Sequence, residues 1–336
     1  MSQWKHLDVR TIQAEDEIAA MGATIGAAYG GALAATGTSG PGVCLKSEAI
    51  NLAIMLELPL VILDVQRGGP STGLPTKTEQ TDLLQAMFGR NGESPLPILA
   101  PNSPKDCFDT AIEAFRIAVQ HMTPVFILSE GFLANGSEPW RIPSISELEP
   151  FQIQHPDDPA QFHPYDREPD TLARPWVLPG TPGMEHRLGG LEKKPVTGAV
   201  SYAPQDHAEM CQQRAQKVEL IASYIPELEV TGQQQGDLLV LSWGGSYGAV
   251  VTAVQRANRK GLSVGHAHLR YLNPFPRNLG DVLDRYDRVM IPELNSGQLG
   301  LLVRARYLRD VVHLPKLQGQ PFSVSDIETK IENILA

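Results

Sequence analysis

Along the first 130 residues, short continuous apolar runs alternate with longer segments in which apolar residues recur at helical spacing. Four short apolar runs predict buried strands, at residues 32–39, 59–65, 95–101 and 123–130. Three segments with helical spacing lie among them, at residues 17–30, 40–58 and 103–122. The last is expected to begin with Ser103 as its N-cap and Pro104 as its first helical residue. Strands that alternate with helices predict a parallel sheet covered by helices on both faces.

The pattern changes after this unit. Residues 136–205 are rich in proline and show no long apolar period, which is typical of a linker or a functional arm. A helix is predicted over residues 207–225. From Asp237 onward, a second α/β unit is predicted, with strands at 237–244, 262–269 and 287–294 and helices at 249–261, 279–286 and 297–308. The chain is thus expected to fold as two doubly wound parallel-sheet domains, at 1–150 and 236–336, joined by an arm and a helix at 151–235.

Composition narrows the function classes. The 336 residues carry 28 Lys and Arg against 38 Asp and Glu, a formal charge of −10 without a long basic run, so nucleic acid is not expected as a partner. No membrane-spanning run and no signal peptide is apparent. The cysteines at 44, 107 and 211 are scattered, which argues against a structural zinc site, an iron–sulfur cluster or a disulfide scaffold held by this chain. A reducing, cytoplasmic setting fits best.

Two groups of polar residues have competing interpretations. Glu15, Asp16 and Glu17 crowd the start of a helix rich in glycine and alanine, which predicts close packing against a neighbour. A helix dipole stabilises such carboxylates, so a capping role and a ligand-binding role are equally supported. His266 and His268 share one face of a predicted strand, and a structural pair is favoured over a metal site by about five to one.

Two loops that follow predicted strands are also candidates. The turn WGGSYG at 243–248 opens a helix and could hold a phosphate, but it lacks the dinucleotide-binding glycine pattern, and a structural turn is favoured by roughly two to one. Arg67 ends a strand buried on both faces and begins QRGGPSTG, a loop too rich in glycine and proline for a simple hairpin. In such sheets, ligands bind at the carboxyl ends of the strands, so Arg67 is a candidate ligand contact.

Several long segments together resemble one family. They are QAEDEIAAMGATIGAA, TSGPG, SEAINLAIMLELPLVILDVQRGGPSTGLPTKTEQTDLLQAMFGR, LARPWVLPGTPGMEHRLGGLEK and HLRYLNPFP. They resemble the alpha subunit of 2-oxoacid:acceptor oxidoreductases, in particular the 2-oxoglutarate:ferredoxin branch. The resemblance covers nearly the whole chain. It implies that residues 1–150 are a thiamine diphosphate pyrimidine-binding domain and residues 236–336 a transketolase C-terminal-like domain.

The resemblance also assigns roles to residues. Glu17, with Gly22 five positions on, is implied to be the catalytic glutamate that hydrogen-bonds the thiamine pyrimidine ring and so assists deprotonation of the thiazolium; Glu15 is the alternative. Ser39 and Gly40 are implied to contact the cofactor. Arg67, Gly68 and Gly69 are implied to bind the 2-oxoacid, since a guanidinium fork suits a carboxylate. No metal ligand is expected in this chain.

The implied activity is oxidative decarboxylation of a 2-oxoacid with coenzyme A, giving an acyl-CoA, carbon dioxide and reduced ferredoxin. Thiamine diphosphate is expected to be shared with a beta subunit that carries Mg²⁺ and an iron–sulfur cluster, and a gamma domain or chain is a further possible partner. The family's first strand, its Tyr-Pro-Ile-Thr-Pro-type loop and its first helix have no counterpart, so the chain resembles an N-terminally truncated subunit. A catalytically silent assembly subunit is the alternative; an unrelated nucleotide-binding protein is disfavoured by the missing glycine pattern.

Overall fold

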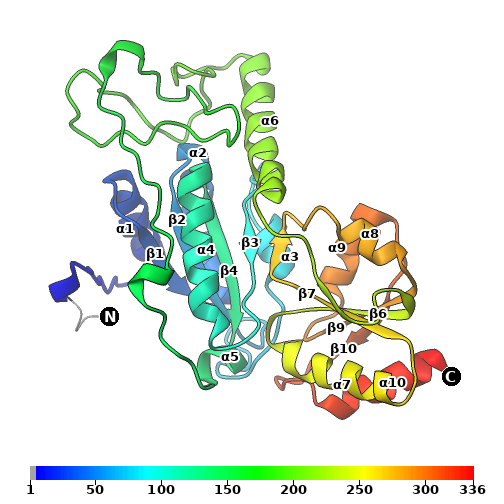
Figure 1. Ribbon diagram of the computed structural model, residues 1–336. Helices are drawn as coiled ribbons and strands as arrows, with labels where there is room; N and C mark the ends of the chain where they lie inside the picture. The colour runs from blue at the N-terminus through cyan, green and yellow to red at the C-terminus, as the bar shows by residue number, and fades with distance from the viewer. Residues whose placement is uncertain (1–4) are drawn as a thin grey trace.

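The structure, a computed structural model, describes residues 5–336. The first sheet contains all four strands predicted in this region, in the order β1, β2, β4, β3 and β8 (Figure 1). These are β1 (Ala34–Thr38), β2 (Leu60–Gln66), β4 (Pro124–Glu130), β3 (Ile98–Leu99) and β8 (Tyr271–Asn273). The first four run parallel, whereas β8 pairs antiparallel with β3. An edge strand of the first sheet therefore comes from the second half of the chain.

Helices cover both faces of this sheet, as predicted. Along β2, Leu60 and Ile62 pack with α1 (Glu17–Tyr29) and α2 (Gly40–Leu56), whereas Val61 packs with α4 (Asp106–His121) on the other face. Successive side chains of a strand point to opposite faces, which explains why this run is apolar throughout. The start of α4 differs from prediction by two residues: Ser103 Oγ accepts a hydrogen bond from the Asp106 amide at 3.3 Å, but a turn at 104–105 precedes the helix.

The second sheet has the order β10, β9, β6, β7 and β5. Its strands are β10 (Val312–Pro315), β9 (Tyr286–Glu293), β6 (Gly236–Trp243), β7 (Val264–Leu269) and β5 (Val230–Gly232). One face is covered by α7 (Tyr247–Arg259) and α10 (Val324–Leu335), and the other by α8 (Leu279–Asp284) and α9 (Gln298–Tyr307). Strand β5 is antiparallel to β7. Each sheet thus has one antiparallel edge strand that the sequence did not indicate, while the predicted doubly wound, parallel-dominated fold is confirmed.

The two sheets share one continuous apolar core. On the face of β2 that α1 and α2 cover, Ile62 belongs to the same buried cluster as Trp243 of β6 and Leu299 of α9. Gln80 adds polar contacts: its side chain donates to the Trp243 carbonyl at 2.9 Å and accepts from the Leu294 amide at 3.0 Å. The short helices α3 (Leu83–Phe88) and α5 (Gly131–Asn135), which lacked a sequence signal, flank this contact. The two sheets are thus packed as one body.

Gly245, in the turn before α7, lies tightly against Glu130 at the end of β4. A Cβ atom at this position would lie 1.9 Å from Glu130 Oε1 and 3.1 Å from Phe132 Cδ1. We expect Gly245→Ala to lower the free energy of unfolding by about 1–3 kcal/mol, the usual cost of overpacking, measured by denaturant unfolding. Gly248→Ala is the control, because within the described residues no atom lies within 4 Å of a Cβ there. Equal stability of the two variants would contradict this account.

Residues 136–203 form the predicted arm. The structure describes only two 3₁₀ turns in it, at Ile145–Glu147 and Pro159–Gln161, before α6 (Pro204–Leu220) begins three residues earlier than predicted. In Figure 1 the arm first runs from α5 along the side of α4 and then folds beyond the ends of α2 and α4, beside α6. Buried Glu57, just after α2, pairs with Arg167 of the arm and Lys217 of α6. Burial alone would raise the pKa of Glu57, but these two cations hold it well below its usual range. These ion pairs hold the arm and α6 against the end of α2, which packs on the first sheet.

Candidate active site

The three carboxylates at the start of α1 separate into different roles. Asp16 is the N-cap, since its Oδ1 accepts a hydrogen bond from the Ala19 amide at 2.7 Å. Glu15 is exposed and lies before the helix. Glu17 is the first helical residue and is half-buried. The capping interpretation is therefore correct for Asp16. Of the three carboxylate residues, Glu17 is the one that is partly buried.

Glu17 faces the first turn of α2. A Cβ atom at Gly42 would lie 3.1 Å from Glu17 Cγ and 2.0 Å from Thr38 Oγ1, so only glycine fits between them. Lys46 lies beneath this contact, almost fully buried, and donates to the Glu17 carbonyl oxygen at 2.9 Å. Burial lowers the pKa of Lys46, while the Glu17 and Asp16 carboxylates oppose that shift. The Glu17 side chain is thus partly exposed above a tightly packed backbone turn, where its carboxylate can accept a hydrogen bond from a ligand.

The glycine-rich side of α1 is open. The buried residues of the helix are Met21, Thr24, Ile25 and Ala28, whereas Gly22 is exposed. Among the described residues, none comes within 4 Å of a Cβ built at Gly22 or at Gly26. The helix packs closely on α2 through its other side, where Met21, Ile25 and Ala28 are buried, but the described residues leave the side that carries Gly22 and Gly26 uncovered.

Ser39 and Gly40 begin α2 beside Asp82. Ser39 is the N-cap residue, but its side chain makes no capping hydrogen bond to the described residues. Gly40 is buried, and a Cβ there would lie 2.6 Å from Asp82 Oδ2. Asp82 in turn lies close enough to Arg67 for the guanidinium to favour its ionised form. Asp82 thus links the start of α2 to the loop that follows β2.

That loop, residues 67–80, is closed by its own backbone. The Gly68 amide donates to the Lys77 carbonyl at 2.9 Å, and the Gly68 carbonyl accepts from the Leu74 amide at 2.8 Å. Both polar groups of Gly68 are therefore used inside the loop, while Gly69 is exposed. Arg67 is half-buried, and its buried Nε has no hydrogen-bond partner among the described residues. An unpaired guanidinium N–H at the carboxyl end of β2 is suited to an anionic ligand.

Sequence reasoning missed the buried acids next to Arg67. Asp64 is 1% exposed, and neither of its oxygens meets a hydrogen-bond donor within the described residues. Burial, and then the neighbouring Asp82, raise the pKa of Asp64 well above its usual range. Burial also raises the pKa of Asp82 to about 6, with Glu79 adding to the shift and Arg67 opposing it. Burial and the proximity of the two carboxyls therefore both disfavour a pair in which both groups are ionised. A charged residue inside the apolar run VILDV was the available signal.

Glu130, at the end of β4, is a second missed acid. It is 1% exposed and lies against Gly245. Burial raises its pKa to about 7, although the Gly245 amide and the Thr78 hydroxyl oppose the shift. Because its folded-state pKa lies above the usual value of 4.5, the folded state binds its proton more tightly than the unfolded chain does.

This shift makes stability depend on pH. The contribution of Glu130 is full below about pH 4.5 and is lost as pH rises through about 7. A shift of this size corresponds to about 3 kcal/mol. Glu130→Gln should remove the fall in the free energy of unfolding that deprotonation of Glu130 causes. We therefore expect the variant to lose less stability than the wild type between pH 5 and 8.5 in urea unfolding. Parallel pH profiles for the two proteins would show that the Glu130 carboxyl does not carry the effect.

The two histidines of β7 form a structural cluster. Ser242 Oγ lies 2.8 Å from His266 Nε2 and 2.8 Å from His268 Nδ1, and the Tyr247 ring packs against both. Burial lowers the pKa of His266 to about 4, and burial, with a smaller contribution from His266, lowers that of His268 well below its usual range. Both rings are therefore neutral and hydrogen-bonded to a hydroxyl, which supports the structural interpretation. The turn at 243–248 is likewise filled by the contact of Gly245 with Glu130.

Comparison with known proteins now identifies the family. Residues 1–201 match the family model of the pyruvate flavodoxin/ferredoxin oxidoreductase thiamine diphosphate-binding domain, and residues 236–327 match core domain II of pyruvate:ferredoxin oxidoreductase. The chain belongs to this oxidoreductase family. The resemblance inferred from the sequence motifs is confirmed, and residues 17–82 of the site lie within its thiamine diphosphate-binding domain.

Individual members of the oxidoreductase family agree. The chain is 55% identical, over its whole length, to the 2-oxoglutarate oxidoreductase subunit KorA of Mycobacterium tuberculosis, of which it spans 51%. It is 32% identical over 95% of its length to the 2-oxoglutarate synthase subunit KorA of Methanothermobacter marburgensis, of which it spans 85%. The chain thus spans about half of one curated relative and most of another.

Solved structures give the same family and fold. A 2-oxoglutarate:ferredoxin oxidoreductase from Magnetococcus marinus, with 2-oxoglutarate, coenzyme A and succinyl-CoA bound, superposes with a TM-score of 0.95 at 33% identity, over 100% of this chain and 59% of that one. A split-gene transketolase, 13% identical with a TM-score of 0.52 over 94% of this chain and 80% of that one, shares the fold alone. Among the described residues, no helix has both the length and the apolar character needed to cross a bilayer.

Proposed function

We propose that this chain is the alpha subunit of a thiamine diphosphate-dependent 2-oxoacid:ferredoxin oxidoreductase. The reaction joins a 2-oxoacid, 2-oxoglutarate in our proposal, to coenzyme A, giving the acyl-CoA and carbon dioxide, with the electrons passing to ferredoxin. The observation that carries the proposal is the placement of Arg67. Its guanidinium has an unpaired N–H and acts electrostatically on Asp82, Asp82 lies against Gly40 at the start of α2, and the same turn of α2 holds Gly42 against Glu17.

Glu17 is proposed as the catalytic glutamate. Thiamine diphosphate, when bound, supplies the electron sink for decarboxylation. The Glu17 carboxylate would accept a hydrogen bond from a pyrimidine ring nitrogen and so bias the position of a proton on that ring. Lys46 fixes the backbone of Glu17 from below. Glu15, which is exposed, is retained as the alternative, and Gly22, Ser39 and Gly40 as cofactor contacts.

Arg67 is proposed to bind the substrate carboxylate, with Gly69 and the loop backbone at Gly68 shaping the site. The guanidinium is held by a loop that the second sheet supports, because a Cβ at Gly319 would lie 2.8 Å from Lys77 Cβ in the same loop. Burial raises the pKa of both Asp64 and Asp82, which disfavours a double negative charge near an incoming anion. This arrangement supports recognition of an acid by a positioned guanidinium.

The remaining components are proposed to come from partners. A beta subunit would supply the diphosphate site with Mg²⁺ and an iron–sulfur cluster, and ferredoxin would accept the electrons; a gamma domain or chain is a further partner. The described cysteines, Cys44, Cys107 and Cys211, are free and scattered over the chain, which supports placing the cluster elsewhere. We place the enzyme in the cytoplasm and expect neither nucleic acid nor membrane as a partner.

Reconstitution tests this function. The chain is mixed with its beta partner, thiamine diphosphate, Mg²⁺ and coenzyme A, and reduction of a viologen dye is followed after addition of 2-oxoglutarate or pyruvate. We expect dye reduction that requires both chains and coenzyme A and is faster with 2-oxoglutarate. A stable complex that reduces no dye with either acid would instead support a catalytically silent assembly subunit.

A further inference from the structure

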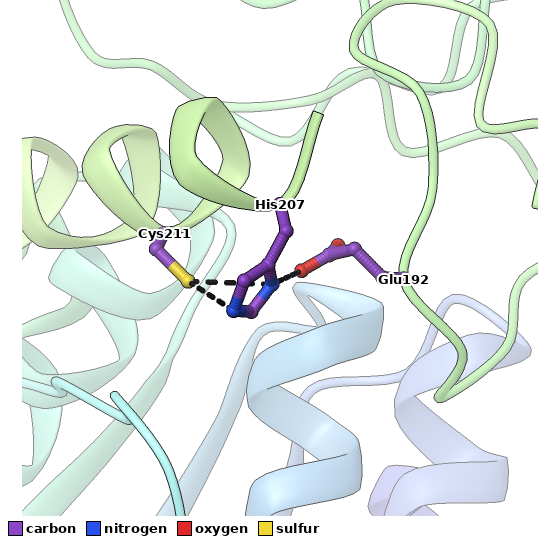
Figure 2. A group of neighbouring side chains, drawn as sticks. All are labelled: Glu192, His207 and Cys211. Atoms are coloured by element: carbon purple, nitrogen blue, oxygen red, sulfur yellow. Dashed lines mark hydrogen bonds and ion pairs between the residues drawn. The ribbon is translucent and has the colours of Figure 1, made fainter. Parts of the chain in front are cut away.

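Three side chains with metal-binding atoms meet where the arm passes α6. This place is separate from the candidate active site formed by α1, α2 and the loop at residues 67–80. His207 and Cys211 lie one turn apart on α6, and Glu192 reaches them from the arm (Figure 2). One potential ligand atom from each residue lies within 4.8 Å of the others. Residues four apart on a helix share a face, which explains how His207 and Cys211 point to the same place.

The spacing of these atoms is close to that of a tetrahedral metal site. Zinc–sulfur distances near 2.3 Å and zinc–nitrogen or zinc–oxygen distances of about 2.0–2.2 Å place neighbouring ligand atoms roughly 3.4–3.6 Å apart. Cys211 Sγ lies 3.8 Å from His207 Nδ1, so this pair already fits. His207 Nδ1 and Glu192 Oε2 are hydrogen-bonded at 2.6 Å and would have to separate by less than about 1 Å. His207 is 65% exposed and has room to make this adjustment.

We propose that Glu192, His207 and Cys211 bind a divalent cation of the zinc class, with water as the fourth ligand. A thiolate, an imidazole and a carboxylate form a donor set that favours zinc over Mg²⁺ or Ca²⁺, which prefer oxygen ligands alone. The ion replaces the proton of the Cys211 thiol and the hydrogen bond between His207 and Glu192. The sequence expectation that this chain holds no metal ligand is thereby revised as part of the proposal.

Arg214 sets the strength of the site. Its Nη2 lies 3.2 Å from Cys211 Sγ and 3.5 Å from Glu192 Oε2, and its side chain is 5% exposed. A guanidinium therefore faces two of the three ligands and must give up those contacts when the cation enters. Like charges repel at this distance, so we expect an exchangeable site with micromolar affinity rather than a permanent structural zinc.

Binding would join the arm to α6. Glu192 lies in the irregular segment before the helix, whereas the other two ligands lie in its first two turns. The cation would therefore hold the arm to the helix at a point beyond the buried Glu57 cluster. Cys211 would lose its reactivity while the metal is bound, because its sulfur would be a metal ligand.

Cysteine alkylation tests the site in the assembled complex. The complex is incubated with Zn²⁺ or with Mg²⁺ and then with iodoacetamide, and the labelling rate of each cysteine is measured by peptide mass spectrometry. We expect micromolar Zn²⁺ to slow labelling of Cys211 by about tenfold or more, with no effect of Mg²⁺. Cys44, which is exposed on α2, is the internal control.

Variants distinguish coordination from other effects of zinc. His207→Ala and Glu192→Gln should each raise the Zn²⁺ concentration for half-protection by about 10–100-fold. Arg214→Met should lower it, because the competing charge is removed. Absence of Zn²⁺ protection at Cys211 in the folded wild type, equal protection of Cys44, or unchanged protection in His207→Ala would each overturn the proposal.

Discussion

Replacing Glu17 with glutamine should lower the turnover number of the assembled enzyme by a factor of about 100 or more, the usual scale for positioned acid–base help. Glutamine keeps the size of the side chain but presents a weaker acceptor to a ring nitrogen. The Glu17 backbone contact with Lys46 is unaffected by the change, so folding and assembly should be retained. The turnover number is measured by dye reduction at saturating 2-oxoacid and thiamine diphosphate.

Glu15→Gln is the matched control for this prediction. Glu15 is exposed and lies two residues before Glu17, outside the helix, so its change should alter turnover far less. If Glu15→Gln is the more damaging variant, the catalytic role belongs to Glu15. If neither variant reduces turnover, no carboxylate of this segment acts on the cofactor.

Replacing Arg67 with lysine should raise the Michaelis constant for the 2-oxoacid by about 30-fold or more. Losing a desolvated charge contact with the substrate costs about 2–5 kcal/mol, and lysine lacks the planar fork that binds both oxygens of a carboxylate. The buried, unpaired Nε is the donor whose replacement matters. Steady-state kinetics with varied 2-oxoacid and fixed coenzyme A measure the effect.

Arg10→Lys is the control for the Arg67 variant. Arg10 pairs with Asp8 at 3.8 Å, and both side chains are almost fully exposed, so this pair contributes at most about 1 kcal/mol and tolerates lysine. Complex formation with the beta chain should be normal in both variants. Unchanged kinetics in Arg67→Lys would make Arg67 an ordinary loop residue.

Much of the fold could be predicted because its central strands are strongly patterned. Residues 59–65 are buried on both faces and so read as one apolar run, and their helices show the complementary period. The antiparallel edge strands β5 and β8 could not be predicted, because each contains only three residues, too few to display a period. Strand β8 pairs with a partner far away in sequence, and nothing local indicates such a pairing.

The candidate site shows the same division. Arg67 and Glu17 could be singled out because each follows a recognisable local signal, the end of a buried strand or the start of a helix. The buried acids could not be assigned in this way, because burial, the first cause of their raised pKa values, depends on residues distant in sequence. Asp64 meets Asp82, and Glu130 meets Gly245 of the other sheet. Burial and partner identity are tertiary properties, so the sequence alone cannot supply them.

The antiparallel pairing of β8 with β3 has a consequence for synthesis on the ribosome. Strand β3 is made long before β8, and at about 5–20 residues per second its partner follows on the order of 10–30 s later. During that interval the first sheet has an unpaired edge, the kind of surface that invites aggregation. If the gene were split between residues 201 and 236, the β3 edge would stay unpaired until the second polypeptide bound and supplied β8.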